Sequence, residues 1–434
     1  MAVSDLVTLD QPRQSDLDTC VHCGLCLNAC PTYRELRVEM DSPRGRIYQM
    51  ARVANGAPIG ESYIEHIGLC LACRGCETAC PSGVKYGRLV EAARAQIEDH
   101  IERPWHVRWL RALFFKKLLP SRLNLAIVGA MLYLYQVSGL KWLVGMLGFL
   151  PAKLRDIESL APEIEAPFFF SYYGKTLAAE GKQRYRVAFL GGCMANICFA
   201  RLNEATVRVL RKNGCEVSIP EAQTCCGALH VHSGLAGDAR ALARKNIDAI
   251  PAADYDAIIT NAAGCGSTLK EYRDLLEHDP LYAEKARAFS AKMKDVTEFL
   301  ASIGLNEELA ATQTTATYQD SCHLAHGQKI RAAPRQLLGN VPGLEFREMQ
   351  LPDLCCGSAG IYNIMHTNMS LALLRKKMDA VNATGAECIV TANPGCMLQL
   401  TAGVRKFGRG QKVMHVVEVL DQAYRGNPAV KSGS

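Results

Sequence analysis

Beyond residue 184, short apolar runs alternate with longer stretches in which apolar residues recur at helical spacing. The runs "VAFLGGCM" and "DAIITNAAGCG" are continuous and apolar, as in buried strands, and "CEVSIP" is a shorter run of the same kind. Between them, "LNEATVRVLRKNG" has helical periodicity and ends at Gly214, a typical helix stop. Strands that alternate with helices in this way predict a parallel sheet covered by helices.

The same order of elements returns about 130 residues further along the chain, as "ATYQDSCH", "LEFREM", "LCCGSAG" and "ECIVTANPGC". We therefore expect an internal duplication that produces two similar α/β lobes. Each lobe carries four cysteines near the ends of predicted strands, and the carboxyl ends of parallel strands are where open α/β sheets bind ligands. The corresponding cysteines are Cys193, Cys225, Cys226 and Cys265 in the first lobe and Cys322, Cys355, Cys356 and Cys396 in the second.

The N-terminal part of the chain has a different pattern. A long stretch of helical period runs from Val84 and ends before Pro104. The expected fold class is a multidomain chain, α+β and mostly helical in its N-terminal module and α/β with parallel sheets in its duplicated lobes. We predict four parts: the N-terminal module at 1–104, a connecting segment at 105–183, a first lobe at 184–311 and a second at 312–434.

The connecting segment has a basic, aromatic first half and an apolar second half. It contains all three tryptophans of the chain, and its run from Leu123 to Leu140 has no charged residue. Three interpretations follow for residues 105–150: a membrane span, an amphipathic region on a membrane surface, or a helical pair docked on a partner subunit or on the chain's own core. The stretch 151–167 contains three prolines and is expected to be a linker.

Composition and charge narrow the function classes. The chain has 434 residues, of which 49% are hydrophobic and 21% charged, as in globular proteins with substantial cores. Its net charge of +6 is spread without a long basic run, so we expect no nucleic-acid partner. The N-terminus lacks the profile of a secretory signal, which favours the cytoplasm. In that reducing compartment, most of the nineteen cysteines are expected to be metal ligands rather than disulfides.

Two cysteine runs in the N-terminal module have the same spacing, C-x2-C-x2-C-x3-C-P. This spacing is typical of bacterial two-cluster ferredoxins, in which three cysteines of a run bind one cluster and the fourth binds the other. It disfavours zinc, which prefers separated pairs of cysteines, and the compartment disfavours disulfides. We therefore assign Cys20, Cys23, Cys26 and Cys80 to one 4Fe–4S cluster and Cys70, Cys73, Cys76 and Cys30 to the other.

Residues beside the runs are candidates for tuning these clusters. Gly24 and Gly75 are expected to let the loops approach the inorganic sulfides closely. Arg44 and Arg46 either offset the negative charge of the clusters or begin a solvated helix. Two neighbouring clusters indicate a relay for single electrons rather than a hydrolytic site.

The function of the eight lobe cysteines is left open by their spacing. Four thiols per lobe suit an iron–sulfur cluster or a zinc ion, a dithiol that exchanges electrons, or a scaffold without a metal. Four histidines near these thiols are expected to be structural, namely His230, His232, His323 and His326. Three further cysteines have no counterpart in the other lobe and are expected to be plain buried residues, namely Cys198, Cys215 and Cys388.

These motifs resemble those of the iron–sulfur subunit of bacterial glycolate oxidase. That family joins an N-terminal ferredoxin module to two cysteine-rich CCG repeats, and it has relatives among heterodisulfide reductase subunits, lactate-utilisation proteins and the third subunit of anaerobic glycerol-3-phosphate dehydrogenase. The resemblance covers nearly the whole chain. It is carried by stretches such as "CVHCGLCLNACPTYRE", "NAAGCGSTLKEY", "DPLYAEKAR" and "LCCGSAGIY".

The resemblance implies the electron-transfer subunit of a complex that oxidises glycolate to glyoxylate, with no catalytic residue in this chain. FAD is expected in flavin-binding partner subunits, since this chain lacks a dinucleotide fingerprint. The implied acceptor is membrane quinone, and contact with the cytoplasmic face of the inner membrane is an expectation of the same kind. The other interpretations are an equivalent subunit of a lactate or glycerol-3-phosphate dehydrogenase, a thiol reductase like heterodisulfide reductase, and a structural adaptor.

One departure from the wider family is visible in both repeats. Heterodisulfide reductase relatives end the repeat in C-x2-C and bind a noncubane cluster, whereas here Thr268 and Gln399 replace the last cysteine. We therefore expect no noncubane cluster and no disulfide reduction, while a site of four thiolates per lobe stays open.

Overall fold

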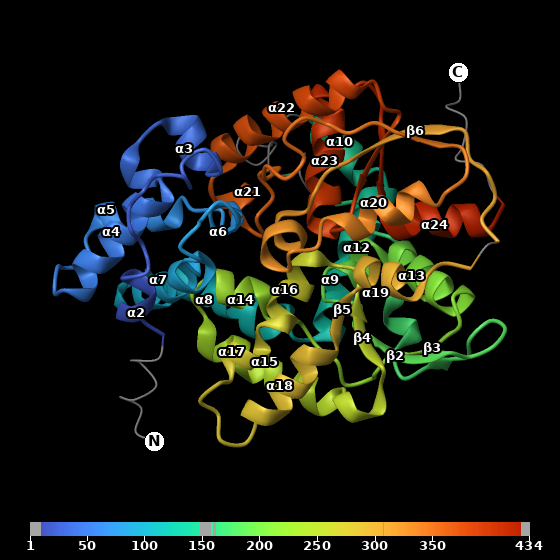
Figure 1. Cartoon of the computed structure of the whole chain (residues 1–434), viewed down its shortest axis with the longest axis horizontal. Helices are drawn as coiled ribbons and strands as arrows, with labels where there is room; N and C mark the ends of the chain where they lie inside the picture. Colours follow the sequence, from blue (N-terminus) through green and yellow to red (C-terminus); the bar gives the residue numbers. More distant parts are fainter. Residues whose placement is uncertain (1–9, 148–157, 159–161, 307, 427–434) are drawn as a thin grey trace.

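The computed structural model describes residues 10–147, 158, 162–306 and 308–426 (Figure 1). It consists of a helical N-terminal module, a helical arm and two α/β lobes. The N-terminal module lies at one end of the molecule, and the lobes make up the rest (Figure 1). Most of the predicted linker at 151–167 lies outside the described residues.

The N-terminal module is built from short helices joined by the two cysteine loops. These helices are α2 (Gln14–Leu17), α3 (Pro31–Leu36), η1 (Glu39–Asp41), α4 (Pro43–Ala54), α5 (Glu61–Gly68), α6 (Gly75–Thr78) and α7 (Tyr86–His100). Helix α7 buries Leu89, Val90 and Ala93 in the core of the module and ends before Pro104, as predicted. The Ser42 hydroxyl accepts a hydrogen bond from the Gly45 backbone at the start of α4 (3.0 Å), which caps that helix.

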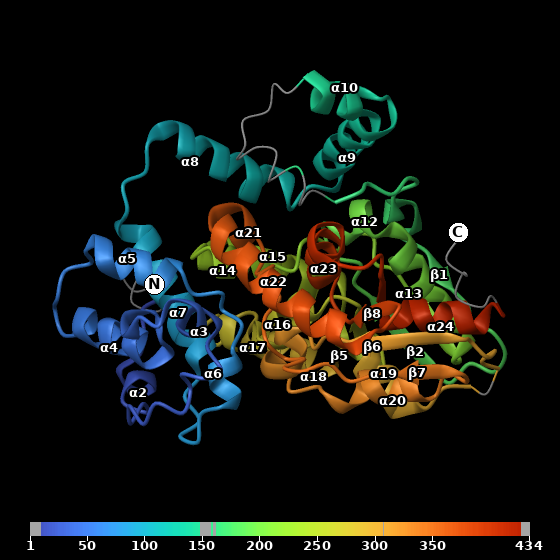
Figure 2. The same cartoon turned by 90° about the horizontal axis from the view of Figure 1, so that it is seen from above.

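The arm contains α8 (Trp105–Ala112), the π-helical turn η2 (Leu113–Leu118), α9 (Arg122–Val137) and α10 (Leu140–Leu147). Figure 2 shows the arm as a layer along one side of the molecule. Pro120 separates η2 from α9, and Gly139, with φ of 79°, separates α9 from α10. Within the described residues, no single helix qualifies as a membrane span; 105–118 and 122–137 qualify only as a pair bent by 108°. Of the three interpretations of this segment, a membrane span by one helix is therefore not supported.

The first lobe contains a five-stranded sheet in the order β1-β3-β2-β4-β5, parallel except for the edge strand β1. Its strands are β1 (Thr176–Leu177), β2 (Tyr185–Phe189), β3 (Cys215–Ser218), β4 (Ala257–Thr260) and β5 (Met293–Asp295). Its helices are η3 (Phe169–Tyr172), α12 (Ala195–Cys198), α13 (Ala200–Lys212), α14 (Ala228–His232), α15 (Ala236–Ala249), η4 (Ala252–Asp254), α16 (Ala263–Lys270), α17 (Tyr272–Leu275), α18 (Ala283–Lys292) and α19 (Val296–Ile303).

The second lobe contains a four-stranded parallel sheet in the order β7-β6-β8-β9. Its strands are β6 (Thr314–Tyr318), β7 (Leu344–Phe346), β8 (Cys388–Thr391) and β9 (Lys412–His415). Its helices are η5 (His323–Gly327), α20 (Ala332–Gly339), α21 (Tyr362–Met365), α22 (Thr367–Thr384), α23 (Pro394–Phe407) and α24 (Val416–Tyr424).

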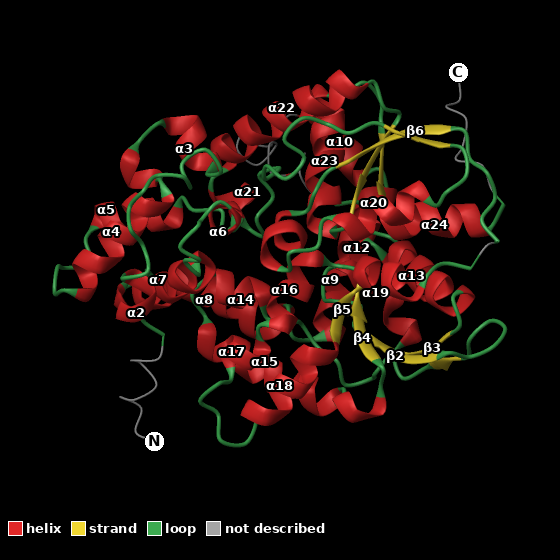
Figure 3. Cartoon of the chain, in the orientation of Figure 1, coloured by secondary structure: helices red, strands yellow, loops and turns green. Residues whose placement is uncertain are grey.

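The predicted duplication is confirmed by the matching strand orders. Strands β3, β2, β4 and β5 of the first lobe take the places of β7, β6, β8 and β9 of the second. Figure 3 shows the strands of the two lobes as separate yellow groups with helices around them. Six of these strands lie where the apolar runs predict them, whereas the short strands β5 and β9 were not foreseen. The first lobe also has an antiparallel edge strand and the extra helices α17 and α18.

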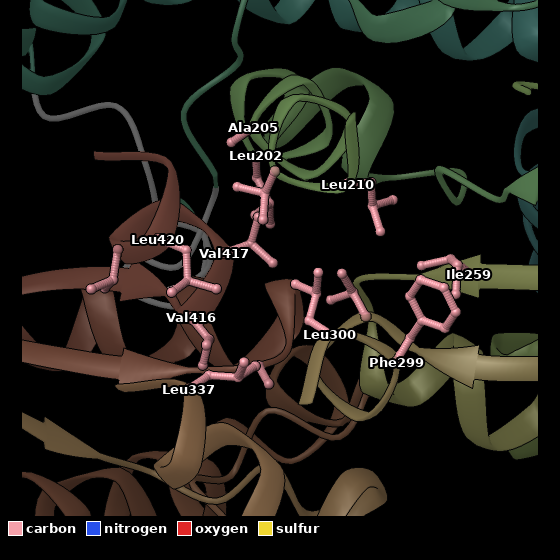
Figure 4. Close-up of a cluster of buried hydrophobic side chains, with 14 of the residues drawn as sticks. Leu202, Ala205, Leu210, Ile259, Phe299, Leu300, Leu337, Val416, Val417 and Leu420 are labelled. Atoms are coloured by element: carbon pink, nitrogen blue, oxygen red, sulfur yellow. The ribbon is translucent and has the colours of Figure 1, made fainter. Parts of the chain in front are cut away.

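The lobes share one hydrophobic core between them. Helix α13 packs on α24, and α19 packs on α20, so that each lobe lays corresponding helices against the other. Figure 4 shows buried side chains of this core converging from both lobes. They include Leu202, Ala205 and Leu210 of α13, Phe299 and Leu300 of α19, Leu337 of α20, and Val416, Val417 and Leu420 of α24. Because the core is common, the carboxyl ends of the two sheets are held in a fixed relation.

Candidate iron–sulfur and thiol sites

Each N-terminal cysteine run folds into a loop with the same backbone path. In the first run His22 and Gly24 have positive φ (52° and 85°), and Ala72 and Arg74 have it at the same positions of the second run (51° and 62°). Left-handed residues among right-handed ones can turn backbone N–H groups into one concavity, which binds anions and iron–sulfur clusters. The two loops are therefore suited to enclosing negatively charged groups.

Gly24 and Gly75 do not play equivalent roles. Gly24 has positive φ, whereas the residue at the same position of the second run is Arg74. Gly75 instead begins α6, and a Cβ atom there would lie 3.1 Å from the carbonyl oxygen of Ala29. The missing side chain at Gly75 thus lets the second loop approach the end of the first run.

Four thiols from both runs lie together, and we call them the inner set (Cys30, Cys70, Cys73 and Cys76). Cys30, Cys70 and Cys76 are buried. Burial raises the pKa of Cys76, and the neighbouring charges of Cys73, Cys70 and Cys30 raise it further. Cys30 therefore lies with three thiols of the other run, as the motif requires for shared clusters. The assignment of these thiols to one cluster stays a prediction.

The other four cysteines of the runs form what we call the outer set (Cys20, Cys23, Cys26 and Cys80). Cys23 is exposed, and the other three are partly buried against the apolar core of the module. Burial raises the pKa of Cys26 to about 11, and the charge of Cys20 also raises it. A protonated thiol of this kind gives up its proton when it becomes a metal ligand. The outer set is thus closer to solvent than the inner set.

A buried arginine lies beside the inner set. The side chain of Arg46 is 1% exposed, and its Nε donates a hydrogen bond to the carbonyl oxygen of His66 (2.7 Å). Its Nη1 lies 3.9 Å from the Sγ of Cys30, and its Nη2 pairs with the buried carboxylate of Asp41 (3.3 Å). Arg46 is therefore placed to offset negative charge there, and its interpretation as part of a solvated helix is wrong.

Arg44 is partly exposed and pairs with Glu39 (2.6 Å), and its guanidinium also donates a hydrogen bond to the carbonyl oxygen of His22 in the first cysteine loop (3.0 Å). Arg44 therefore lies beside the outer set.

Four of the cysteines of the second lobe lie next to one another in a row, which we call the lobe-2 set (Cys322, Cys355, Cys356 and Cys396). Cys355 interacts with Cys322 and Cys356, and Cys356 also interacts with Cys396. The interaction with Cys322 raises the pKa of Cys355, and that with Cys355 raises the pKa of Cys356 to about 12. The four cysteines that the repeat aligns are thus brought together.

The first lobe repeats this arrangement in the lobe-1 set (Cys193, Cys225, Cys226 and Cys265). Cys225 interacts with Cys193 and Cys226, and Cys226 also interacts with Cys265. Hydrogen bonds with Cys225 and Cys265 lower the pKa of Cys226, whereas the interaction with Cys193 raises that of Cys225. Each lobe therefore presents four adjacent thiols at the carboxyl ends of its strands.

The lobe-2 set touches the inner set. Cys73 packs with Cys322 and Cys355 in one apolar cluster, and after burial the charge of Cys355 is the main cause that raises the pKa of Cys73. The Tyr362 hydroxyl of this lobe also donates a hydrogen bond to the carbonyl oxygen of Leu69, just before the second run (3.0 Å). The N-terminal module and the second lobe therefore meet at their thiols.

The lobe-1 set lies under the arm instead. Cys225 is buried in a cluster with Phe115 and Leu119 of the arm, and Cys193 is partly buried against the same cluster. Cys193 also packs against the neighbouring cluster that contains Leu125 of α9. The two lobes thus offer their thiols to different parts of the chain.

The side chain of Asn393 links the lobe-2 set to the backbone beside the lobe-1 set. Asn393 accepts a hydrogen bond from the backbone N–H of Gly264 (3.4 Å), the residue before Cys265 in the lobe-1 set. Its amide nitrogen donates to the Sγ of Cys396 in the lobe-2 set (3.4 Å). The lobe-1 and lobe-2 sets therefore face one another across the lobe boundary.

Polar residues occupy the positions at which relatives carry a further thiol. Thr268 is buried and donates to the carbonyl oxygen of Gly264 (3.5 Å). Gln399 is buried and donates to the Ser370 hydroxyl (2.8 Å). In the described part of the chain, no three acidic, histidine or cysteine side chains converge as ligands of a single metal ion would. A 4Fe–4S cluster differs in that each cysteine binds a different iron.

The histidines near the thiols contact protein groups, as their structural interpretation expects. His230 Nε2 lies 2.8 Å from the carbonyl oxygen of Phe115, and His323 Nε2 lies 3.1 Å from that of Ala72. His232 and His326 contact Glu91 and Thr78 of the N-terminal module, at 3.1 Å and 2.8 Å. The unpaired cysteines Cys198, Cys215 and Cys388 are buried, as predicted.

Sequence reasoning missed three residues at these sites. The hydroxyl of Tyr86 donates to the Sγ of Cys70 (3.6 Å), Asn393 bridges the lobe sets, and Tyr362 joins the second lobe to the N-terminal module. Asn393 stands three residues before Cys396, a proximity that gives a weak signal. Tyr86 and Tyr362 have no signal in the sequence, because their partners are distant along the chain.

Comparison with protein families assigns each part of this architecture. A 4Fe-4S dicluster domain matches residues 16–84, and a cysteine-rich domain matches twice, at 187–270 and 316–401. The linker region of the glycolate oxidase iron-sulfur subunit matches residues 106–161, which include the arm.

Comparison with curated proteins gives relatives that align over almost the whole chain. The probable glycolate oxidase iron-sulfur subunit of Bacillus subtilis (strain 168) is 43% identical over 419 residues, 94% of each chain. The glycolate oxidase iron-sulfur subunit of Escherichia coli (strain K12) is 35% identical over 417 residues, again 94% of each chain. Lactate utilization protein A of Bacillus subtilis (strain 168) is 31% identical over 237 residues, 54% of this chain and 99% of that protein.

Proposed function

Because the chain belongs to the family of glycolate oxidase iron–sulfur subunits, we propose that it takes electrons from a flavin-bearing glycolate-oxidising partner and delivers them to a membrane quinone. Its family makes it an iron–sulfur electron-transfer component of an oxidoreductase complex. The identity of the donor and of the acceptor is our proposal. The observation that carries it is the order of the thiol sets in space. The charge of Cys30 in the inner set acts on Cys26 of the outer set, Cys73 of the inner set packs with the lobe-2 set, and Asn393 links the lobe-2 set to the backbone beside the lobe-1 set.

The outer and inner sets would each hold one 4Fe–4S cluster. The residues fit such groups, since both loops form anion-binding concavities, Arg46 supplies a buried positive charge, and Tyr86 donates to a thiol. When bound, the clusters supply carriers of single electrons. The chain's own residues fix the thiols, shield the inner set from water and provide hydrogen bonds that tune the sulfur atoms.

The outer set is where the electron donor would dock. Cys23 is exposed, and its neighbours Val21 and Leu25 are 68% and 61% exposed. Apolar side chains that surround an exposed ligand loop favour contact with another protein. A donor bound there would lie close to the outer set and far from the lobes.

We further propose that both lobe sets hold an iron–sulfur cluster. Each set has four adjacent thiols at the ligand-binding edge of its sheet, and the lobe-2 set contacts Cys73 of the inner set. Thr268 and Gln399 replace the last cysteine of each repeat, so that neither set has a fifth thiol at that position, which favours a four-thiolate site over the noncubane cluster of thiol reductases.

Iron and sulfide quantitation on anaerobically purified full-length protein tests the ligand proposal. About eight irons per chain would mean that only the two N-terminal sets are loaded, and about sixteen would mean that both lobes hold a 4Fe–4S cluster. Protein without iron would refute the whole proposal.

A second measurement tests whether glycolate is oxidised by the flavoprotein partner and not by this chain. The purified chain should show reducible iron–sulfur signals and no glycolate oxidation, and glycolate should reduce it only after flavoprotein subunits are added. Turnover of glycolate by the chain alone would contradict the proposal. Reduction by a lactate-oxidising partner instead would favour the second candidate, a lactate dehydrogenase subunit, which the similarity to lactate utilization protein A supports.

A further inference from the structure

The arm exposes many large apolar side chains, which together we call the arm face. On α8 and η2, Trp105, Trp109 and Leu113 follow one another four residues apart and therefore lie on one side of the helix. Further exposed apolar residues of the arm are Leu110, Leu123, Ile127, Met131, Leu132, Leu134, Val137, Leu140, Trp142, Leu143 and Met146. Exposed apolar patches of this extent mark interaction sites in folded proteins.

Helix α9 is apolar on two opposite sides. Leu125 and Gly129 are buried, and Leu125 packs in a cluster with Ile197 of the first lobe. Ile127 and Met131, four residues apart, point away from that cluster and are exposed. The inner side thus fixes the arm to the lobe, and the outer side has no partner within the described residues.

The charge of the arm has one sign. Residues 105–147 contain six lysines and arginines and no aspartate or glutamate. Arg122 and Lys116 reach acidic residues of the first lobe, whereas Arg108, Lys117 and Lys141 form no ion pair within the described part of the chain. These free cations favour a partner surface of negative charge.

All three tryptophans of the chain lie on the arm face. Trp105, Trp109 and Trp142 are 77%, 60% and 69% exposed. Tryptophan prefers the headgroup level of a bilayer, where its ring is buried and its N–H stays hydrated. Exposed aromatic and aliphatic residues with interspersed lysine and arginine are typical of helices that lie in the plane of a membrane.

We propose that the arm face docks this protein on the surface of an anionic bilayer. The helices would lie on the membrane rather than cross it, since the described arm has no helix long and apolar enough to span and its two main segments are bent by 108°. Docking would place the lobe-1 set, which lies directly under Phe115 and Leu119, close to the lipid. The docking does not depend on the proposed function. The delivery of electrons from the lobe-1 set to an acceptor dissolved in the lipid does rest on it.

Vesicle flotation of the full-length protein tests the proposal. The protein should float with vesicles that contain phosphatidylglycerol and stay behind with phosphatidylcholine alone, and salt should weaken the binding. Intrinsic tryptophan emission reports the arm face alone, because the chain has no tryptophan elsewhere. It should shift to shorter wavelength on binding and be quenched by brominated lipid.

Paired variants locate the contact. Lys117→Glu with Lys141→Glu should lower partitioning about thirtyfold or more, because each basic residue near an anionic surface contributes to binding. Trp109→Ser with Met131→Ser should lower it by at least a similar factor. The matched controls are Lys182→Glu and Leu281→Ser, exposed residues outside the arm, and these should bind as the parent does.

Each other outcome overturns the proposal. Absence of flotation, equal binding to neutral lipid, or insensitivity to the arm variants would remove the bilayer as occupant. Loss of flavoprotein binding or of self-association in the arm variants, with vesicle binding kept, would assign the face to a protein partner. Glycolate-dependent reduction of the iron–sulfur signals, measured without lipid, tests the proposed function separately and should not change in the arm variants.

Discussion

The two lobes have the same fold and the same four thiols, but the thiols face different parts of the chain. In the second lobe, Cys322 and Cys355 lie beside Cys73 of the N-terminal module. In the first lobe, Cys193 and Cys225 lie beneath the apolar side chains of the arm. The duplication fixed where thiols stand on each sheet, and the packing of two unrelated segments gave each set its own neighbour.

Because of this difference, the two equivalent thiol sites have different neighbours. One duplicated site receives contact from the cluster-binding module, and the other is covered by the arm. Asn393 holds the two sites against each other across the lobe boundary. The lobe-2 set thus lies next to the N-terminal module and the lobe-1 set next to the arm, although both sets consist of the same four aligned cysteines.

The last helices of the lobes differ in a second respect. Helices α19 and α24 both begin with a capping box, in which Glu298 and Glu418 accept a hydrogen bond from the N-cap backbone. In the first lobe, burial raises the pKa of Glu298, but hydrogen bonds from Lys270 and Lys294 more than offset it, so that the pKa is lowered. In the second lobe, burial raises the pKa of Glu418 to about 7.

The largest effect is expected from breaking the lobe-2 set. Cys355→Ser removes the thiol that lies beside Cys73, so quinone reduction by the assembled complex should fall to the background rate. Cys225→Ser in the first lobe should also abolish quinone reduction. Freeze-quench EPR should distinguish the two variants. In Cys225→Ser, glycolate should still reduce the lobe-2 set. In Cys355→Ser, glycolate should no longer reduce the lobe-1 set.

The control for these variants is Cys388→Ser, a buried lobe-2 cysteine outside the set, which should retain both activity and signals. If glycolate reduced the lobe-1 set normally in Cys355→Ser, the proposed order of the sets would be wrong.

The next effect concerns the pH dependence of stability. A carboxyl whose pKa is raised in the folded state binds its proton more tightly there than in the unfolded state. Its contribution to stability is therefore lost as the pH rises from the ordinary pKa of a glutamate through about 7. For Glu418 this loss amounts to roughly 3 kcal/mol. Glu418→Gln cannot ionise, so its denaturation midpoint relative to the parent should rise between about pH 5 and about pH 8.

Glu298→Gln is the matched test in the first lobe. The pKa of Glu298 is lowered, so its contribution to stability is present above its ordinary pKa and is lost as pH falls through the lowered one. The variant should therefore be less stable than the parent by a constant amount over the same pH window. Parallel pH profiles for both variants would refute the comparison.

The smallest effect is expected from separating the two lobe sets. Asn393→Ala removes the hydrogen bond across the boundary from Gly264 and the bond to Cys396 within the second lobe, and it should lower the free energy of unfolding by about 1 kcal/mol. It should also shift the EPR signal of the lobe-2 set, because the amide donates to Cys396. Asn382→Ala, which removes a side chain bound to the carbonyl oxygen of Phe407 away from the thiols, should lower stability without that shift.

Much of this protein follows from its sequence alone. Local periodicity predicted six strands of the two sheets, and the repeated cysteines predicted the duplication, because both depend on residues that are near in sequence or alike in spacing. The run spacing likewise predicted that Cys30 joins Cys70, Cys73 and Cys76, because four closely spaced thiols in a run cannot all reach one cluster.

Other features were decided only by the tertiary structure. The contact of Cys73 with Cys355, the bridge at Asn393 and the burial of Arg46 all join residues that no local pattern relates. The apolar run from Leu123 to Leu140 had three interpretations, because hydropathy records how apolar a segment is and not which of its sides is covered. Packing on the first lobe covered one side of α9 and left the other exposed, and that choice depends on surfaces assembled from the whole chain.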